Sequence, residues 1–170
     1  MNILKYETSS ADFESYSKAG PVIFLAGPTV RGNQQHLTSW RIAACEEFRK
    51  LGFNGTLILP EFEDKAESDQ YRYDIPLWEF AGLTIADCIM FWIPRTRELI
   101  GLTTNFEIGY WISRDFNKIV YGRPNDAYRM KYIDIMWGAV ANGDLNPIHS
   151  SLEETVKNSI QKAEYYFNIR

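Results

Sequence analysis

The feature that most constrains the fold is the apolar run Asp87-Cys-Ile-Met-Phe-Trp-Ile-Pro94, which is soon followed by Gly101-Leu-Thr-Thr-Asn-Phe-Glu107-Ile-Gly-Tyr-Trp111. A β-branched and aromatic run of this length that ends at a proline is typical of a buried parallel strand. The polar triplet 103–105 is interpreted as the N-cap of the next helix, which places Glu107 in its first turn or two. Because open α/β sheets bind ligands beyond the carboxyl ends of their strands, Glu107 is expected at a ligand-binding edge.

Segments of strand and helix character alternate along the rest of the chain. Strands are predicted at 22–27, 56–60, 88–93 and 118–121, with 2–6 and 147–148 as candidates for a fifth, and helices at 36–51, 75–83, 104–114, 127–136 and 151–165. This alternation predicts an α/β fold with a doubly wound parallel sheet of four to five strands and helices on both faces. The 170 residues are expected to form a single domain, with residues 1–20 as a polar N-terminal extension.

Composition excludes several classes of protein. The net charge of −4 does not favour nucleic acid as a partner. No apolar run approaches the roughly 18 residues that a membrane span requires, and the N-terminus does not resemble a signal peptide, so a cytoplasmic protein without a membrane partner is expected. Cys45 and Cys88 fall in a predicted helix and a predicted strand, where buried free thiols are expected.

Candidate binding or catalytic residues lie at the ends of three strands. After the first strand, the backbone and side chains of Gly27, Pro28, Thr29 and Arg31 are candidates to bind a phosphate or a sugar hydroxyl, although a plain strand-to-helix turn explains them equally well. Asp87 is a turn residue or a cap on the same reasoning. Glu107 is either a tuned catalytic carboxylate or a partner of the helix dipole.

Metal and triad chemistry find no support in the sequence. His36 and His149 lie near predicted helix starts without a pattern of partner ligands, so no metal site is expected. Neither a Ser-His-Asp nor a Cys-His arrangement is indicated.

The chain resembles the nucleoside 2-deoxyribosyltransferases, and more closely their shorter deoxyribosyltransferase-like branch, over about residues 21–135. The block 101–109 is the most specific part. The matching residues are Ile23-Phe-Leu-Ala-Gly-Pro28, Ser39-Trp-Arg41, Gly55-Thr56, Pro60-Glu61, Trp78-Glu79, Ala86-Asp87, Phe91-Trp-Ile-Pro94, Gly101 to Gly109, Gly122-Arg-Pro124 and Met130-Lys-Tyr-Ile-Asp134.

This resemblance implies a flavodoxin-like sheet and cleavage of the N-glycosidic bond of a 2′-deoxynucleoside. Glu107 matches the family's nucleophile, which attacks C1′ and forms a covalent deoxyribosyl-enzyme that a second base or water resolves. Asp87 matches the position that contacts the base and helps to protonate it. Trp92 is a candidate stacking face for the base, and Thr104 and Asn105 are candidates to hydrogen-bond the sugar. The partner is then a small nucleoside or nucleotide, and no metal or organic cofactor is implied.

The chain departs from the family pattern at two positions. Gly101 stands where the transferases carry an acidic residue, and Phe24 stands where a tyrosine often orients the nucleophile. A hydrolase of nucleoside 5′-monophosphates, with a phosphate bound by the segment 31–33, and a non-catalytic nucleotide-binding module therefore remain alternatives.

Two expectations concern surfaces. Arg95 and Arg97 are interpreted as solvated charges rather than ligand-binding groups. The apolar stripe of the helix 151–165 packs either on its own sheet or against a second copy, because family members usually form homo-oligomers.

Overall fold

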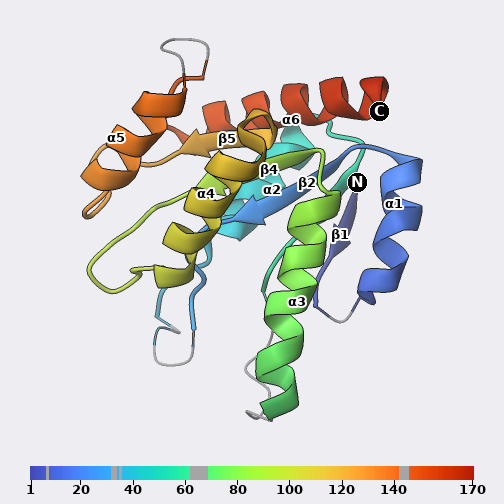
Figure 1. The fold of residues 1–170 in the computed structure, drawn as a ribbon, viewed down its shortest axis with the longest axis horizontal. Coiled ribbons are helices and arrows are strands. Elements are labelled where there is room, and N and C mark those ends of the chain that lie inside the picture. The colour runs from blue at the N-terminus through green and yellow to red at the C-terminus, as the bar shows by residue number, and fades with distance from the viewer. Residues whose placement is uncertain (7, 32–33, 35, 62–68, 142–145) are drawn as a thin grey trace.

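Five parallel strands form one sheet in the order β1-β3-β2-β4-β5 (Figure 1). The computed structural model describes residues 1–6, 8–31, 34, 36–61, 69–141 and 146–170. The strands are β1 (Asn2–Leu4), β2 (Val22–Ala26), β3 (Thr56–Ile58), β4 (Cys88–Trp92) and β5 (Ile119–Gly122). Each neighbouring pair is parallel. The predicted α/β fold with a doubly wound, flavodoxin-like sheet is confirmed.

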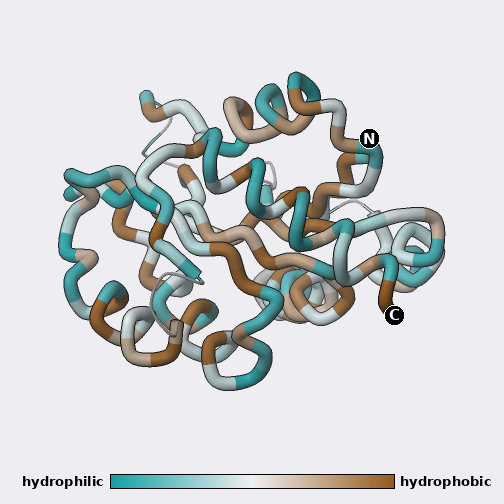
Figure 2. The backbone as a smooth tube through the Cα atoms, turned by 90° about the horizontal axis from the view of Figure 1, so that it is seen from above, coloured by the Kyte–Doolittle hydropathy of each residue, from teal (hydrophilic) through white to brown (hydrophobic). Residues whose placement is uncertain are grey.

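Helices cover both faces of the sheet. One face carries α2 (Trp40–Lys50) and α6 (Leu152–Ile169), and the other carries α1 (Phe13–Ala19), α3 (Asp69–Ile85), α4 (Leu102–Asp115) and α5 (Lys131–Val140). Alternation along β2 shows why, since Ile23 and Leu25 pack with α2 and α6, whereas Phe24 and Ala26 pack with the other group. Figure 2 shows the hydrophobic strands running through the middle of the molecule between the helices.

The strand order creates one switch point. β2 pairs with β3 on one side and with β4 on the other, so the connections that follow β2 and β4 leave in opposite directions across the sheet. In open α/β sheets, the crevice beyond the carboxyl ends of two such strands is where ligands bind. The segments that follow Ala26 and Trp92 meet at this crevice.

Several element boundaries differ from the sequence prediction. The fifth strand is β1, whereas the segment 147–148 only leads into an isolated bridge between His149 and Gly122. α3 begins at Asp69, so Pro76 lies inside the helix rather than in its first turn. α1 was not predicted, and its Phe13 reaches the core.

The stripe of α6 packs on the sheet of its own chain. Val156 and Ala163 belong to the core cluster beneath the sheet, and Leu152 and Ile160 pack against that cluster. Ser151 caps the helix, because its hydroxyl accepts a hydrogen bond from the Glu154 amide at 3.2 Å.

The described part of the chain also bears on cysteine and membrane predictions. Cys45 and Cys88 are buried and unpaired, as predicted. None of the helices that the structure describes combines the length and the apolarity that a membrane crossing requires.

Candidate active site between two helices

Glu107 lies in the second turn of α4, at the crevice beyond β4. The helix begins at Leu102, directly after Gly101, whose backbone is left-handed (φ 61°, ψ 65°) and offers no side-chain cap. The prediction that the triplet 103–105 forms the cap is therefore wrong, because these residues already belong to the first turn. Glu107 is half-buried and faces the neighbouring helix α3.

A second carboxylate, Glu79, approaches from α3. The two helices lie side by side on the same face of the sheet (Figure 1). The aromatic rings of Phe80 in α3 and Tyr110 in α4 are in contact, with their centroids 6.0 Å apart. Between them lies a largely apolar pocket of about 410 Å³. Its lining consists of Pro76, Glu79, Phe80, Leu83, Thr103, Phe106, Glu107, Tyr110 and Trp111.

The charge of Glu107 changes the protonation of Glu79. Burial raises the pKa of Glu79, and the nearby charge of Glu107 raises it further, to about 7, against the opposing effect of Arg41 and Arg31. Burial also raises the pKa of Glu107, while the same two arginines lower it. A pair of half-buried acids, of which one has a pKa raised to about 7, suits the acid–base requirements of glycosidic-bond chemistry.

Arg41 of α2 binds the carboxyl end of β2 and the loop that follows it. Its fully buried guanidinium donates hydrogen bonds to the carbonyls of Leu25 (3.0 Å) and Gly27 (2.9 Å) and to the hydroxyl of Thr29 (3.2 Å). Glu61 lies 3.6 Å away as its ion-pair partner. Burial lowers the pKa of Arg41, and Glu61, Glu107 and Glu79 oppose this. The positive charge of Arg41 therefore favours the ionised form of both carboxylates. Its hydrogen bonds to Gly27 and Thr29 hold the loop after β2.

Backbone close packing shapes the loop after β2. Gly27 has φ 152°, and a Cβ there would lie 2.2 Å from the Trp92 carbonyl oxygen, so only glycine fits. Pro28 accepts a hydrogen bond from the Trp40 indole at 2.9 Å. A Cβ at Gly101 would lie 2.9 Å from the Pro28 ring, so this loop rests directly on the start of α4.

Arg31 follows the same loop and acts on both acids through its charge. It lowers the pKa of both Glu79 and Glu107. Its backbone amide donates to the Gln34 side chain at 3.1 Å. The remainder of the predicted phosphate-binding segment, Gly32 and Asn33, lies outside the described residues.

A comparison with protein families agrees with this geometry. The model of the family described as nucleoside 2-deoxyribosyltransferase like matches residues 20–125, which include Arg41, Glu79 and Glu107. The chain belongs to the nucleoside 2-deoxyribosyltransferase-like family. No curated protein matches the chain. Membership indicates a deoxyribosyltransferase-like enzyme with a nucleoside as the substrate class.

The family position represented by Asp87 lies at the other edge of the sheet. Asp87 precedes β4, whereas the segment carrying Glu107 follows it, and the five residues of β4 span about 16 Å. Its carboxylate accepts a hydrogen bond from the Val22 amide at 2.8 Å and pairs with Arg170 at 3.1 Å. The structure does not bring Asp87 to Glu107, so we assign Asp87 to the clasp that holds the end of α6.

Three further predicted site residues do not line the described pocket that holds Glu107. Trp92 is 6% exposed and belongs to the core beneath the sheet, where it packs over Gly122 rather than in the pocket. Thr104 is buried, and its hydroxyl has no hydrogen-bond partner among the described residues. Asn105 faces the opposite side of α4, where its side-chain oxygen accepts a bond from Arg95 at 2.6 Å. Thr103 lines the pocket in their place.

Glu79 is a candidate site residue to which sequence reasoning assigned no role, although Trp78-Glu79 is one of the segments that match the family. It lies in the segment Leu77-Trp-Glu-Phe-Ala81, where one carboxylate stands among apolar side chains. That isolation within an apolar segment, together with the match at Trp78-Glu79, was the available signal. The pairing with Glu107 depends on how α3 and α4 pack, which the sequence order does not reveal.

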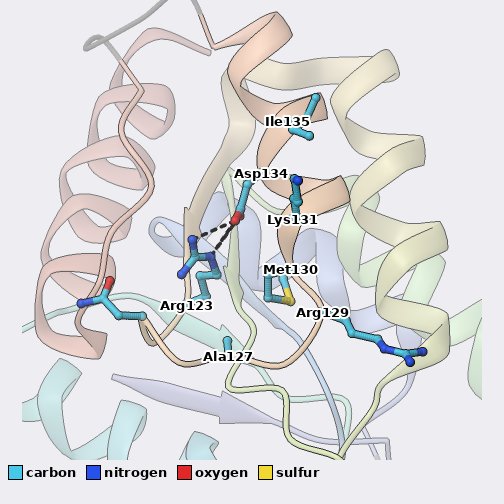
Figure 3. Close-up of a pocket in the computed structure, with 8 residues that line it drawn as sticks. Arg123, Ala127, Arg129, Met130, Lys131, Asp134 and Ile135 are labelled. Carbon is cyan, nitrogen blue, oxygen red and sulfur yellow. Dashed lines mark hydrogen bonds and ion pairs between the residues drawn. The ribbon is translucent and has the colours of Figure 1, made fainter.

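A larger cavity lies elsewhere, beyond β5, and carries different chemistry. Its volume is about 490 Å³, and Arg123 closes one wall through a two-pronged ion pair with Asp134, with a shortest contact of 2.8 Å (Figure 3). The hydroxyl of Tyr121 donates to the same carboxylate at 2.8 Å. Arg123 is thus satisfied within the fold and stabilises the start of α5.

Proposed function

We propose that the protein cleaves the N-glycosidic bond of a 2′-deoxynucleoside, with Glu107 as nucleophile and Glu79 as the group that exchanges a proton with the base. One observation carries this proposal. Two carboxylates from facing helices share an apolar pocket at the switch point, and burial together with Glu107 raises the pKa of Glu79 to about 7. At neutral pH Glu79 is therefore divided between its acid and its base form, as an acid–base catalyst requires.

In the first half-reaction, a carboxylate oxygen of Glu107 attacks C1′ and the C1′–N bond breaks. The departing base takes the proton from Glu79, which leaves a deoxyribosyl ester on Glu107 and a free base. In the second half-reaction, Glu79 removes a proton from an incoming base or from water, whose nitrogen or oxygen attacks C1′ and releases Glu107. Each residue returns to its starting state, as in retaining glycoside cleavage.

The pocket walls suit a nucleobase. Phe106, Tyr110 and Trp111 offer aromatic surface beside the carboxylates. Aromatic faces bind flat heterocycles by stacking, and exclusion of water strengthens the electrostatic interactions near C1′. We infer that the base lies against this surface while the sugar faces the loop 27–29.

The test is incubation with a panel of 2′-deoxynucleosides and their 5′-monophosphates, with and without a second free base, with products separated by chromatography. We expect exchanged nucleoside from the wild type and a loss on the order of 10⁴-fold in Glu107→Gln. Glu153→Gln, an exposed glutamate in the first turn of α6, is the matched control. If the protein instead binds the nucleoside or nucleotide stoichiometrically without releasing free base, and Glu107→Gln leaves this binding unchanged, the protein is a binding module.

A hydrolase of nucleoside 5′-monophosphates is the second candidate, and the position of Arg31 favours it. The charge of this arginine acts on both carboxylates, and a guanidinium close enough to do so suits a 5′-phosphate. In that case Arg31→Ala should raise KM for monophosphates roughly tenfold while plain nucleosides are unaffected. Equal effects on both substrate types would contradict a role in phosphate binding.

We also propose that the chain forms a homo-oligomer through α3. Tyr73, Leu77 and Phe80 follow helical spacing and are exposed by 74%, 68% and 46%, beside the site pocket. A second copy that covered this stripe would also close the pocket towards solvent. Light scattering should show an oligomer for the wild type and a monomer for Leu77→Lys, whereas a monomeric wild type would contradict this assembly.

A further inference from the structure

Arg95 is a buried cation without an ion-pair partner among the residues that the structure describes. It follows β4 and is 6% exposed, so its expected role as a solvated surface charge is wrong. One terminal nitrogen donates to the Asn105 side-chain oxygen at 2.6 Å and to the Gly101 carbonyl at 3.5 Å. Its Nε has no hydrogen-bond partner within the described part of the chain. Burial lowers the pKa of Arg95, and only Tyr121 opposes this.

Such an arrangement is unfavourable unless something compensates it. An ionised group that is buried without an opposite charge destabilises a protein by several kcal/mol. Arginine cannot lower this cost by releasing its proton at neutral pH. A neutral amide and a carbonyl are the partners that the described fold provides, and a bound anion would supply the opposite charge that they lack.

Arg95 lines a pocket of about 350 Å³ between α4 and α5. Most of the wall is apolar and consists of Ile108, Gly109, Ile112, Tyr132, Ile133 and Met136. The charged and amide groups in the lining are Arg95, Asn105 and Arg129, and Arg95 donates to Asn105 at 2.6 Å. This is the layout of a site for a small amphipathic molecule, with a charged head at one end and an apolar body along the wall.

Arg129 supplies a second cation with an unusual backbone. Its φ is 53°, the one positive value among the described non-glycine residues. Left-handed backbone costs a non-glycine residue on the order of 1 kcal/mol and is often kept at ligand-binding positions. Figure 3 shows Arg129 directed away from the Arg123–Asp134 pair and towards α4. Its guanidinium lies 5.1 Å from the Tyr128 ring centroid, and the residue lines the same pocket as Arg95.

We propose that this pocket binds a small organic anion, with a carboxylate or phosphate head between Arg95 and Arg129 and a flat or aliphatic body against Ile108, Ile133 and Met136. The pocket is separate from the proposed active site, because α4 lies between the two. Glu79 and Glu107 would repel an anion on their side of that helix, whereas none of the described residues that line this pocket is acidic. The inference does not depend on the proposed activity.

Binding can be measured with para-fluorobenzoate as the probe, by fluorine NMR line broadening and by thermal denaturation of the full chain. We expect saturable broadening and a raised Tm with para-fluorobenzoate, and neither effect with the neutral para-fluorobenzamide. Phenyl phosphate and inorganic phosphate distinguish the two possible heads and show whether the apolar body contributes. Equal effects of para-fluorobenzoate and para-fluorobenzamide would overturn the proposal.

Two variants test the assignment of the cations. Arg95→Met keeps an apolar side chain of similar length, and we expect it to weaken para-fluorobenzoate binding at least about tenfold. Arg129→Gly relieves the left-handed backbone while it removes the second cation, and a roughly threefold to tenfold weaker affinity is expected. Arg49→Ala, an exposed arginine of α2 on the other face of the sheet, is the control and should bind as the wild type does. Unchanged affinity in both Arg95→Met and Arg129→Gly would refute the site, and Arg129→Gly keeps the test decisive if Arg95→Met does not fold.

Discussion

Both sides of α4 hold ionisable side chains at poorly hydrated positions, but the side chains are acidic on one side and basic on the other. On the α3 side, Glu79 and Glu107 share an apolar pocket, and on the α5 side Arg95 is buried among apolar side chains. Both sides hold charge where water is scarce. A carboxylate in such a place can keep its proton, and burial with the adjacent Glu107 raises the pKa of Glu79 to about 7.

Arginine has no equivalent response, because its guanidinium remains charged throughout the physiological range. The difference teaches which kind of function each pocket can support. A group whose pKa lies near neutrality can exchange protons with a substrate, which is chemistry. A permanently charged group can only attract an opposite charge, which is binding. One helix therefore separates a proton-exchanging pocket from an anion-attracting one.

The largest expected effect concerns proton delivery by Glu79. Glu79→Gln cannot protonate the leaving base, so we expect kcat/KM for natural deoxynucleosides to fall by about 10²–10⁴-fold. A deoxyriboside with para-nitrophenolate as the leaving group needs no proton, and its cleavage should change much less. Steady-state rates for both substrates provide the measurement. Glu107→Gln is the matched comparison and should slow both reactions on the order of 10⁴-fold. An equal loss for both substrates in Glu79→Gln would contradict the role in proton transfer.

The same residue should control how stability depends on pH. The pKa of Glu79 is raised in the folded state, so the folded chain binds more protons than the unfolded chain between about pH 4.5 and 7, and stability falls as pH rises through that window. Glu79→Gln removes this loss. We expect a stabilisation at pH 8 on the order of 3 kcal/mol at most, and none below about pH 4.5. Urea unfolding at the two pH values measures it, and a stabilisation that does not vary with pH would show that desolvation of the charge is not the cause.

Arg95 should give the contrasting result. Arg95→Met removes a buried charge that does not titrate, so in buffers without organic anions we expect about 1–2 kcal/mol of stabilisation at every pH between about 5 and 9. Asn105 is exposed and can bond to water once its partner is lost. Parallel unfolding curves for the Glu79 and Arg95 variants compare the two sides of α4 directly. Destabilisation by Arg95→Met would mean that Asn105 and the Gly101 carbonyl already satisfy the guanidinium.

The sequence was informative about elements and about the residue nearest the switch point. Apolar runs predicted β2 and β4, and the polar segment after β4 predicted a helix carrying Glu107. These predictions succeed because strand burial and helix starts are set by neighbours along the chain. The direction of each parallel strand also follows from the alternation with helices, which places Glu107 at the ligand-binding edge.

The rest depends on contacts between distant segments. Asp87 is next to β4 in sequence but precedes it. It therefore lies at the amino end of the strand, whereas the site lies beyond the carboxyl end. Arg95 stands in a polar loop, and only the packing of α4 against α5 buries it. Glu79 becomes a candidate site residue only because it shares a pocket with Glu107, which lies in a helix that begins more than twenty residues later. Charge burial is a property of the packed molecule, and composition of a loop does not predict it.

Gly101 joins the two sides, and its substitution should change stability no more than Arg95→Met does, in the opposite direction. Its backbone is left-handed, its carbonyl accepts a bond from Arg95, and a Cβ there would lie 2.9 Å from the Pro28 ring. Gly101→Ala should therefore lower stability by about 1–2 kcal/mol, through the backbone conformation and displacement of Pro28. The same arrangement explains why an acidic side chain does not fit at this position.

Gly138→Ala is the control for the general effect of replacing a helical glycine. Gly138 lies in α5, and a Cβ there would point into open space with no described atom within 4 Å, so alanine should raise stability by roughly 0.5–1 kcal/mol. Thermal unfolding of both variants gives the comparison. If Gly101→Ala is as stable as Gly138→Ala, the loop after β2 does not rest on α4, and the two pockets are not joined through Gly101. If Gly101→Ala is destabilised and also weakens para-fluorobenzoate binding, the start of α4 holds both pockets in place.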